Sequence, residues 1–526
     1  MKFFPQNTQR SARMFSRTIA VFTIPVLLAS GCSVGPDYVK PTVNDFEEWK
    51  SWSNSEERSQ VSFTQQMLPP NWWFAFQDPV LNELQHAAFS SSLDLKTAQL
   101  RFAQVRVQRQ TVAAQRGPSL DVNAGASRQR QSEYGVGTRV TDVMGGDRGA
   151  VVDKLSEPFT SYQAGFDASW ELDLWGRVRR SIEAADADVQ QQQALLDLAK
   201  LVLVSDIARN YFDLRTVQDL IQLTREDIAA LSEQVDLLKV RVDNGLVDHF
   251  DLERQRSELI SMKSNLPPLL AQERMAENRI TLLLGKMPGS LQALLKPVTP
   301  ENDLALPDLE LGLPSELALR RPDIRAAEAR LHQATANIGV ARADLYPSFR
   351  LGARFGYESY LSEEFLNWGS RAWSVSPMIN LPLFDRGRRK SVVQLRELQQ
   401  QEAAISYEQT LLKAWQEIDD ALSTYAAEWE QMEQLKLRVQ SAHDVFDMAE
   451  AKYSAGLANL TALLDTQRSY LQARRDLINS EGRLYVQFVA INKAIGNVPL
   501  QVNEQAPNDV SLDKNRDDVN LSSINP

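Results

Sequence analysis

Apolar and polar side chains alternate in four stretches of the chain, and this period of two residues is typical of β-strands. The predicted strands cover about 119–130, 160–173, 348–359 and 371–384, so they form two hairpins. Pro377 and Pro382 fall within the last stretch, where a missing backbone donor would interrupt a central strand. The alternation is also compatible with a soluble hairpin that is buried on one face only.

Outside these stretches, apolar residues recur every three or four positions, which predicts helices. The first helix is expected from Asp78 to Arg116, ended by Pro118, and long helical tracts are expected over about 176–284 and 386–495. The only glycine between Gly176 and Gly285 is Gly245, so a helix from Gly176 to that point would be about 100 Å long. Helices of this length usually pack as coiled coils. We expect the charges along the first tract, including Arg215, to form a solvated face, and the histidines, including His332, to lie at the surface.

Landmarks of the first half recur in the same order in the second half. Pro118-Ser119 matches Pro347-Ser348 at an offset of 229 residues, and Gly245-Leu246 matches Gly456-Leu457 at an offset of 211. A duplication of one large unit explains this order. Because the offset drops from 229 to 209 inside the hairpins, the first hairpin is about 20 residues longer than the second. The excess falls in a glycine-rich loop between Gln131 and Pro158.

The expected segments are a signal peptide (1–31), an arm (32–77), repeat 1 (78–290), a linker (291–313), repeat 2 (314–499) and a polar disordered tail (500–526).

The N-terminus has the features of an export signal. Basic residues precede an apolar run from Ile19 to Ala29, which is too short to span a membrane and matches the core of a signal peptide. Ser30-Gly31-Cys32 follows, and small residues before a lone cysteine resemble a bacterial lipobox, with cleavage before Cys32 and lipid on its thiol. Ser33 in the next position usually permits passage to the outer membrane. The alternative is an ordinary signal peptide with a bystander cysteine.

Composition excludes several classes of function. The formal net charge of −11 argues against a nucleic-acid partner, and four histidines with one cysteine are too few for a metal or thiol site. The chain carries no nucleophile elbow and no phosphate-binding loop, so we expect no enzyme activity, no metal and no cofactor. Four strands cannot close a barrel in lipid, where an open edge is not tolerated, so a pore would have to be shared between chains.

Several motifs in correct order resemble the TolC-like outer-membrane factor family, specifically its lipoprotein branch that serves tripartite efflux pumps. They include Trp72-Trp73, Ser169-Trp-Glu-Leu-Asp-Leu-Trp-Gly-Arg177, Arg320-Arg-Pro-Asp323, Leu345-Tyr-Pro-Ser348 and Leu463-Leu-Asp-Thr-Gln-Arg468. The resemblance implies a mainly α-helical homotrimer with a 12-stranded outer-membrane β-barrel and a long periplasmic α-helical barrel. It also implies a periplasmic adaptor, an inner-membrane pump, and N-palmitoyl and S-diacylglycerol groups on Cys32. The motifs themselves are explained by structure: Pro322 suits a first helical turn, and Trp72, Trp73 and Phe76 suit packing.

The resemblance assigns the functional residues to the two chain reversals. Gly245-Leu246 and Gly456-Leu457 match adaptor-docking positions at the periplasmic tips. Asp465 matches an acid that lines the narrowest part of the entrance, and Asp251 matches part of the lock that keeps the tips closed. The alternative is that Asp251 caps its helix and that Asp465 is a first-turn acid. The family's basic lock partner is replaced by Ala458.

These observations predict an exit duct in the outer membrane that passively conducts small toxic molecules. A duct for type I protein secretion is a second hypothesis, because the partner and not the chain distinguishes the two. A lipid-anchored periplasmic scaffold without a pore is a third, and it predicts no alternating strands.

Overall fold

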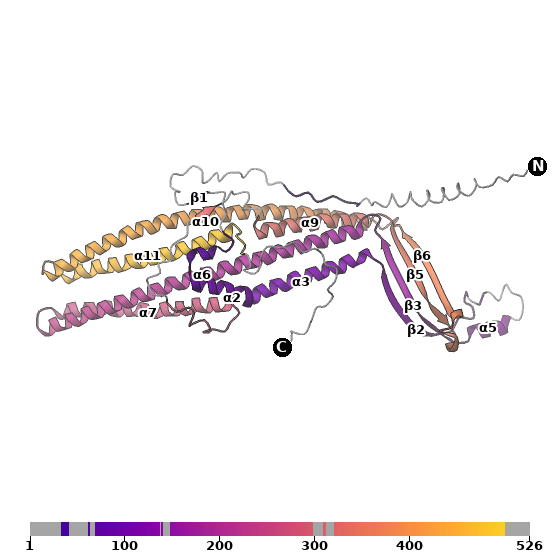
Figure 1. Ribbon diagram of the computed structural model, residues 1–526, viewed down its shortest axis with the longest axis horizontal. Helices are drawn as coiled ribbons and strands as arrows, with labels where there is room; N and C mark the ends of the chain where they lie inside the picture. The colour runs from indigo at the N-terminus through magenta and orange to yellow at the C-terminus, as the bar shows by residue number, and fades with distance from the viewer. Residues whose placement is uncertain are drawn as a thin grey trace, which may run out of the picture. The chain divides into compact units, whose positions relative to one another are not determined.

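The computed structural model describes residues 33–41, 61–63, 69–136, 138–139, 148–297, 309–311 and 320–499 (Figure 1). Cys32, the expected signal peptide and the expected tail lie outside the described residues. The elements are β1 (Val61–Phe63), η1 (Trp72–Phe76), α2 (Pro79–Ser91), α3 (Leu93–Ala113), η2 (Ala114–Arg116), β2 (Ser119–Gln129), α5 (Arg148–Ser156), β3 (Phe159–Leu172), α6 (Arg177–Asp243), α7 (His249–Leu283), β4 (Leu309–Leu311), α9 (Pro322–Ala343), β5 (Ser348–Ser359), η3 (Ser362–Glu364), η4 (Trp368–Ser370), β6 (Arg371–Asn380), α10 (Arg388–Ser454) and α11 (Leu460–Ala494).

The chain forms two compact units. The sheet unit comprises Met1–Pro41, Phe102–Gln192 and Ala326–Glu408. The hairpin unit comprises Thr42–Arg101, Gln193–Arg325 and Gln409–Pro526. Among the residues that the structure describes, none of the helices combines the length and the apolar character needed to cross a membrane.

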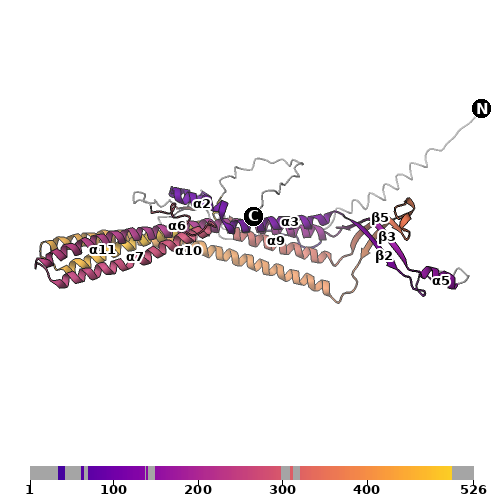
Figure 2. The same cartoon turned by 90° about the horizontal axis from the view of Figure 1, so that it is seen from below.

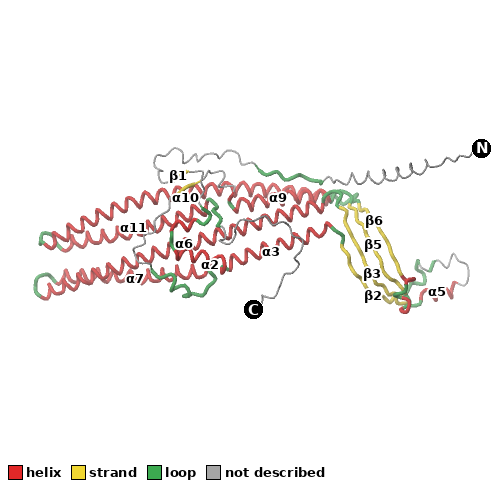
Figure 3. The backbone as a smooth tube through the Cα atoms, in the orientation of Figure 1, coloured by secondary structure: helices red, strands yellow, loops and turns green. Residues whose placement is uncertain are grey.

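The sheet unit contains one antiparallel sheet in the order β2-β3-β5-β6 (Figure 3). Its register places apolar side chains on one face, because Val122 lies opposite Phe166 and Phe166 lies opposite Phe355. The other face carries polar pairs such as Asp167 opposite Arg354, whose charged groups are 3.8 Å apart. Among the described residues, β2 and β6 each pair with a single strand, so both edges of the sheet are open.

The last strand is shorter than the sequence predicts. It ends at Asn380 rather than at 384, because Pro382 follows and cannot donate to a ladder. Pro377 is nevertheless inside β6, opposite Leu351. Proline is tolerated there because β6 is an edge strand, in which one row of backbone groups does not bond to a strand of the sheet.

The glycine-rich loop of the first hairpin contains an unexpected helix, α5, whose last residue accepts a hydrogen bond from Arg130 Nε at 3.1 Å.

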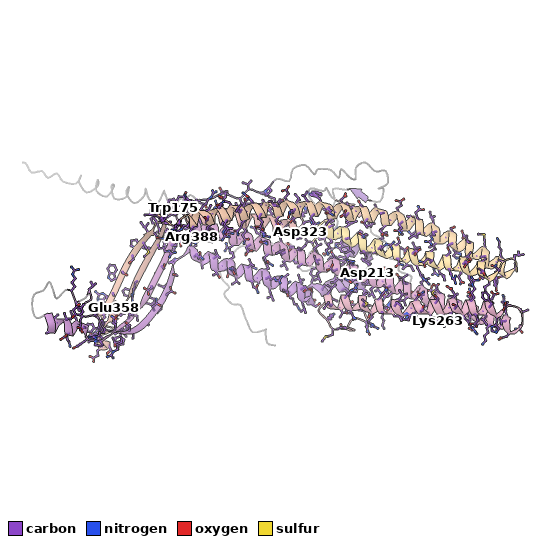
Figure 4. The ribbon with its side chains drawn as sticks, turned by 180° about the vertical axis from the view of Figure 1, so that it is seen from behind. Trp175, Asp213, Lys263, Asp323, Glu358 and Arg388 are labelled. Atoms are coloured by element: carbon purple, nitrogen blue, oxygen red, sulfur yellow. The ribbon has the colours of Figure 1, made fainter. Side chains whose placement is uncertain are left out.

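In the sheet unit, four helices lie side by side in the same order as the four strands, because each helix adjoins one strand in the sequence. Ion pairs connect neighbouring helices: Arg109 to Asp186 (α3 to α6, 2.7 Å), His332 to Glu183 (α9 to α6, 3.1 Å) and Arg342 to Glu397 (α9 to α10, 2.7 Å). Trp175 and Arg388 mark the ends of the strands where α6 and α10 begin (Figure 4). The order of the helices is therefore α3-α6-α9-α10, with α3 and α10 at the edges.

Residues 33–41 lie against α6 and α9 in the sheet unit. Gly35 has a φ of +107°, and a Cβ there would come within 2.5 Å of the Gly339 Cα, so position 35 requires glycine. Tyr38 stacks on His332 with ring centroids 4.3 Å apart, and its hydroxyl donates to Glu328 at 3.3 Å. His332 was expected at the surface and is half-buried, because Tyr38 stacks on one face of its ring. Burial raises the pKa of the Tyr38 hydroxyl, and the nearby Glu328 carboxylate raises it further.

The hairpin unit contains two helical hairpins, which α7 and α11 form with the parts of α6 and α10 that start at Gln193 and Gln409 (Figures 1 and 2). Helices α6 and α10 each have 67 residues, and α7 and α11 each have 35. Trp72, Trp73 and Phe76 are buried as expected, and Phe76 packs edge-on against Phe488 at 5.3 Å. A short parallel pairing of β1 with β4 was not predicted, and it lies partly in the expected linker.

Two further sequence expectations for this unit are wrong. The helix expected over 78–116 is broken at Ser92, whose ψ of 127° is extended, so that α2 and α3 are separate helices. Arg215 does not belong to a solvated face. It is buried, and it donates to the hydroxyl of Tyr211 at 3.0 Å and to the Lys296 carbonyl at 2.8 Å. A buried guanidinium is stable here because polar partners replace water.

Candidate functional site at the two helix reversals

Both long helices end in the same backbone motif. At the end of α6, the amide of Leu246 donates to the Arg241 carbonyl at 2.9 Å, and the amide of Gly245 donates to Val242 at 2.8 Å. At the end of α10, Leu457 donates to Lys452 at 2.8 Å and Gly456 donates to Tyr453 at 3.0 Å. This pair of bonds defines a Schellman motif, which needs a left-handed residue at the glycine position. The φ values of +72° and +73° at the two glycines meet that need.

The two glycines are required by backbone conformation rather than by packing. A Cβ at Gly245 or Gly456 would have no neighbouring atom within 4 Å, so another residue would fit in space but would be strained in φ. The leucine that follows each glycine is 74% exposed at Leu246 and 80% exposed at Leu457. In many Schellman motifs this residue packs back onto its own helix. Both reversals therefore present an unpartnered leucine.

The returning helices begin with side-chain caps. Asp248 accepts a hydrogen bond from the amide of Phe250 at 3.2 Å, and Asn459 accepts one from Ala462 at 2.9 Å. Asp251 lies in the first turn of α7, where an acid interacts favourably with the helix dipole. Asp465 does not lie in the first turn of α11, which contains no acid, so the alternative that Asp465 is a first-turn acid is wrong.

The structure brings the two reversals together at the same end of the hairpin unit (Figures 1 and 2). A core cluster joins Leu238 of α6, Leu252 of α7 and Leu464 of α11, and Tyr453 of α10 packs against it. Arg254 of α7 donates to the hydroxyl of Thr461 on α11 at 2.5 Å. A guanidinium thus bridges the two hairpins three residues from Ala458.

Arg468 and Glu258 are site residues that sequence reasoning missed. Arg468 donates two hydrogen bonds to Glu258 of α7, and its other terminal nitrogen lies 3.9 Å from Asp465. The carboxyl group of Asp465 is 62% exposed, so its charge remains available to solvent. Glu258 and Arg468 are 210 residues apart, and no local pattern could have paired them.

A second ion pair lies deeper between the hairpins. Asp227 of α6 is buried, 3.3 Å from Arg475 and 3.9 Å from Arg474 of α11. Burial raises the pKa of the Asp227 carboxyl although both arginines lower it. Within the described residues, no group of three or more histidines, cysteines, aspartates or glutamates could hold a metal ion.

Comparison with known proteins identifies the family. The family model described as outer membrane efflux protein matches residues 84–286 and 313–497. This chain belongs to the outer membrane efflux protein family. The family consists of channels rather than enzymes, and the chain is accordingly an efflux protein of the outer membrane.

Individual relatives of the family match most of the chain. The solvent efflux pump outer membrane protein SrpC of Pseudomonas putida is 29% identical over 90% of this chain and 96% of its own. The pyoverdine export outer membrane protein OpmQ of Pseudomonas putida is 30% identical over 82% of this chain and 89% of its own. The solved structure of the outer-membrane channel OprN matches with a TM-score of 0.79, at 30% identity over 89% of this chain and 99% of that one.

Proposed function

We propose that three copies of this chain form the exit duct of a tripartite efflux pump. The observation that carries the proposal is the open sheet. Strand β2 is exposed over its whole length, including the apolar Leu120 and Val122, and so is β6, including Trp373 and Val375. Long apolar edges of this kind are stable only when they are paired. The same sheet argues against a scaffold without strands.

Three copies would supply 12 strands, with β6 of one copy beside β2 of the next. The strands alternate in direction across β2-β3-β5-β6, so this junction is antiparallel like the others. Such head-to-tail contacts close into a ring. The apolar face of the sheet would then contact lipid, and the polar face with Asp167 and Arg354 would line the duct. The long helices would continue the wall as a periplasmic α-helical barrel.

The two reversals would receive the hairpins of a periplasmic adaptor, which in turn binds an inner-membrane pump. Gly245, Leu246, Gly456 and Leu457 are the proposed docking residues, and the exposure of both leucines supports this role because solvated apolar side chains often mark contact sites. In-cell crosslinking from position 246 or 457, followed by mass spectrometry, would identify the adaptor. Capture of no periplasmic protein from either position would contradict the docking role.

Asp465 and Asp251 would restrict the closed entrance. Three copies of Asp465 around a three-fold axis would form a ring of carboxylates that favours cations. Single-channel recording in planar bilayers tests both the duct and the gate. The wild-type trimer should give discrete conductance steps that cations block, and Asp465→Ala should raise the conductance and weaken the block. Absence of steps would contradict the duct, whereas an unchanged Asp465→Ala channel would contradict only the gate.

Cys32 would carry the N-palmitoyl and S-diacylglycerol groups that anchor the chain in the outer membrane. Metabolic labelling with palmitate should mark the wild-type chain and not Cys32→Ser.

The transported molecules would be small toxic compounds, in line with relatives named for solvent efflux and pyoverdine export. Deletion of the gene should sensitise the host to such compounds, and retained resistance in a host without a second duct would contradict this role.

A further inference from the structure

The apolar face of the sheet β2-β3-β5-β6 carries arginine as its only charged residue type. Alternate residues of a strand lie on one face, so the row from Val122 across the sheet to Trp373 fixes which positions share that face. Among these positions in the four strands, the charged residues are Arg128 of β2 and Arg371 of β6, and none is an acid. Glu358, near the same end of the sheet, lies on the opposite face (Figure 4). The apolar face is therefore positively charged.

Both arginines lie at the hairpin-loop end of the sheet. Arg128 pairs with Thr160 beside the first loop, and Arg371 is the first residue of β6 after the second loop. A strand rises about 3.3 Å per residue, so the stretch from Leu120 to Arg128, like that from Arg371 to Ile379, is about 27 Å long. The lipid-facing band of a membrane barrel is about 25 Å tall, and an arginine on it is costly at the centre but nearly neutral at its edge. Both side chains stand at such an edge.

Aromatic side chains accompany the arginines. The Arg371 guanidinium carbon lies 4.2 Å from the centre of the Trp368 ring, and its Nη1 donates to the Trp368 carbonyl at 2.8 Å. Tyr357 lies opposite Arg371 in the register, and Trp368 and Trp373 are 68% and 71% exposed. Arg128 is exposed and has no hydrogen-bond or ion-pair partner among the residues that the structure describes. Exposed aromatic rings beside basic side chains are typical of the boundary between acyl chains and headgroups.

We propose that Arg128 and Arg371 bind the phosphate groups of a phosphorylated glycolipid in the outer leaflet, and this site rests on the proposed duct. In that duct the helices are periplasmic, so the hairpin-loop end of the sheet lies at the outer surface. A guanidinium binds phosphate oxygens through two parallel hydrogen bonds, and the strands place no acid on this face to repel the phosphate. The exposed rings of Trp368 and Trp373 offer flat apolar surfaces to the sugar, which a phospholipid lacks.

Lipid binding to the full-length chain tests the two arginines. Native mass spectrometry in detergent, with a titration of bisphosphorylated lipid A, gives both the oligomeric state and the affinity. Arg128→Gln/Arg371→Gln should bind lipid A at least about tenfold more weakly than the wild type, because charge-assisted hydrogen bonds are lost. Arg350→Gln is the matched control and should bind like the wild type, since Arg350 pairs with Glu171 on the opposite face. If the double variant does not assemble, the two single variants apply, and each should weaken binding.

The choice of lipid tests the ligand and separates this site from the duct. Dephosphorylated lipid A and phosphatidylglycerol should each bind the wild-type trimer at least about tenfold more weakly than lipid A. Equal binding of dephosphorylated lipid A, or equal binding of lipid A to the wild type and the arginine variants, would overturn the site and leave the proposed duct intact. Equal binding of phosphatidylglycerol, or displacement of lipid A by inorganic phosphate at millimolar concentration, would overturn the assignment to a glycolipid. An absence of trimers in the wild type would overturn the duct and the site together.

Discussion

Helices α7 and α11 occupy equivalent places in the two repeats, and yet they are buried to different extents. Both have 35 residues and both follow a Schellman turn. Helix α11 buries 14 residues, including Phe488, whereas α7 buries seven. Duplication thus preserved the backbone of the hairpin while the two copies took different positions in the core.

The sequence of α7 shows the consequence of its peripheral position. Pro267 and Pro268 lie inside α7, where each removes a backbone hydrogen bond, and the equivalent residues of α11 are Ile478 and Asn479. The apolar Leu471 of α11 is 9% exposed, and its equivalent Ile260 of α7 is 67% exposed. We infer that α11 holds the hairpin unit together and that α7 tolerates change.

Truncation of Phe488 should have the largest effect. Its ring is fully buried against Trp72 and Phe76, so Phe488→Ala should cost about 3–5 kcal/mol through lost burial and a residual cavity. The equivalent residue of α7 is Glu277, and Glu277→Ala is the matched control. Thermal unfolding followed by circular dichroism in detergent measures both. Equal midpoints for the two variants would contradict the difference between the helices.

The pair Leu471 and Ile260 gives a smaller but cleaner test, because both side chains are aliphatic. Leu471→Ala should cost about 2 kcal/mol, near the lower end for a buried leucine. Ile260→Ala should change stability by less than about 0.5 kcal/mol, as for most surface substitutions. The same unfolding measurement applies. A loss at Ile260 as large as that at Leu471 would mean that α7 is covered in the assembled protein.

Features that depend on neighbouring residues were largely predictable from the sequence. The alternation of apolar residues placed β2, observed at Ser119–Gln129, within one residue of the predicted 119–130. The sequence repeats located both reversals, and the φ values of Gly245 and Gly456 show why glycine stands there. These features follow from local backbone chemistry, which a pattern in the sequence records directly.

Features that depend on contacts across the fold could not be predicted. The break at Ser92 involves neither glycine nor proline, so no residue type marks it in the sequence. The sequence does not distinguish Arg215 from the other charged residues of its helix, because its partners Tyr211 and Lys296 become its neighbours only in the fold. The contact of Arg468 with Glu258 and the stacking of Tyr38 on His332 each join segments more than 200 residues apart. Local propensity carries no information about such pairs.

The two reversals should respond equally to strain, unlike the helices that follow them. Gly245→Val and Gly456→Val each place a β-branched residue at positive φ, which should cost about 1–3 kcal/mol locally. Because no atom lies within 4 Å of the new Cβ, the cost arises from the backbone alone. Crosslinking to the adaptor in cells should fall for both variants, with Gly369→Val as a control at a glycine without positive φ. Wild-type yields would contradict a role of the turns in docking.

The smallest effect on stability is expected at the contact between the hairpins. Glu258→Gln removes the charge that holds Arg468. Because the Arg468 side chain is 48% exposed, although Glu258 is only 17% exposed, we expect the pair to contribute about 0.5 kcal/mol. Arg468 would then be free to approach Asp465, now 3.9 Å away, and to neutralise its carboxylate. We therefore expect weaker cation block in planar bilayers with almost unchanged thermal unfolding.

The double variant Glu258→Gln/Arg468→Gln is the control, because it removes the competing cation and should restore the block. A block that stays at the wild-type level in Glu258→Gln would mean that Arg468 does not control the charge of Asp465.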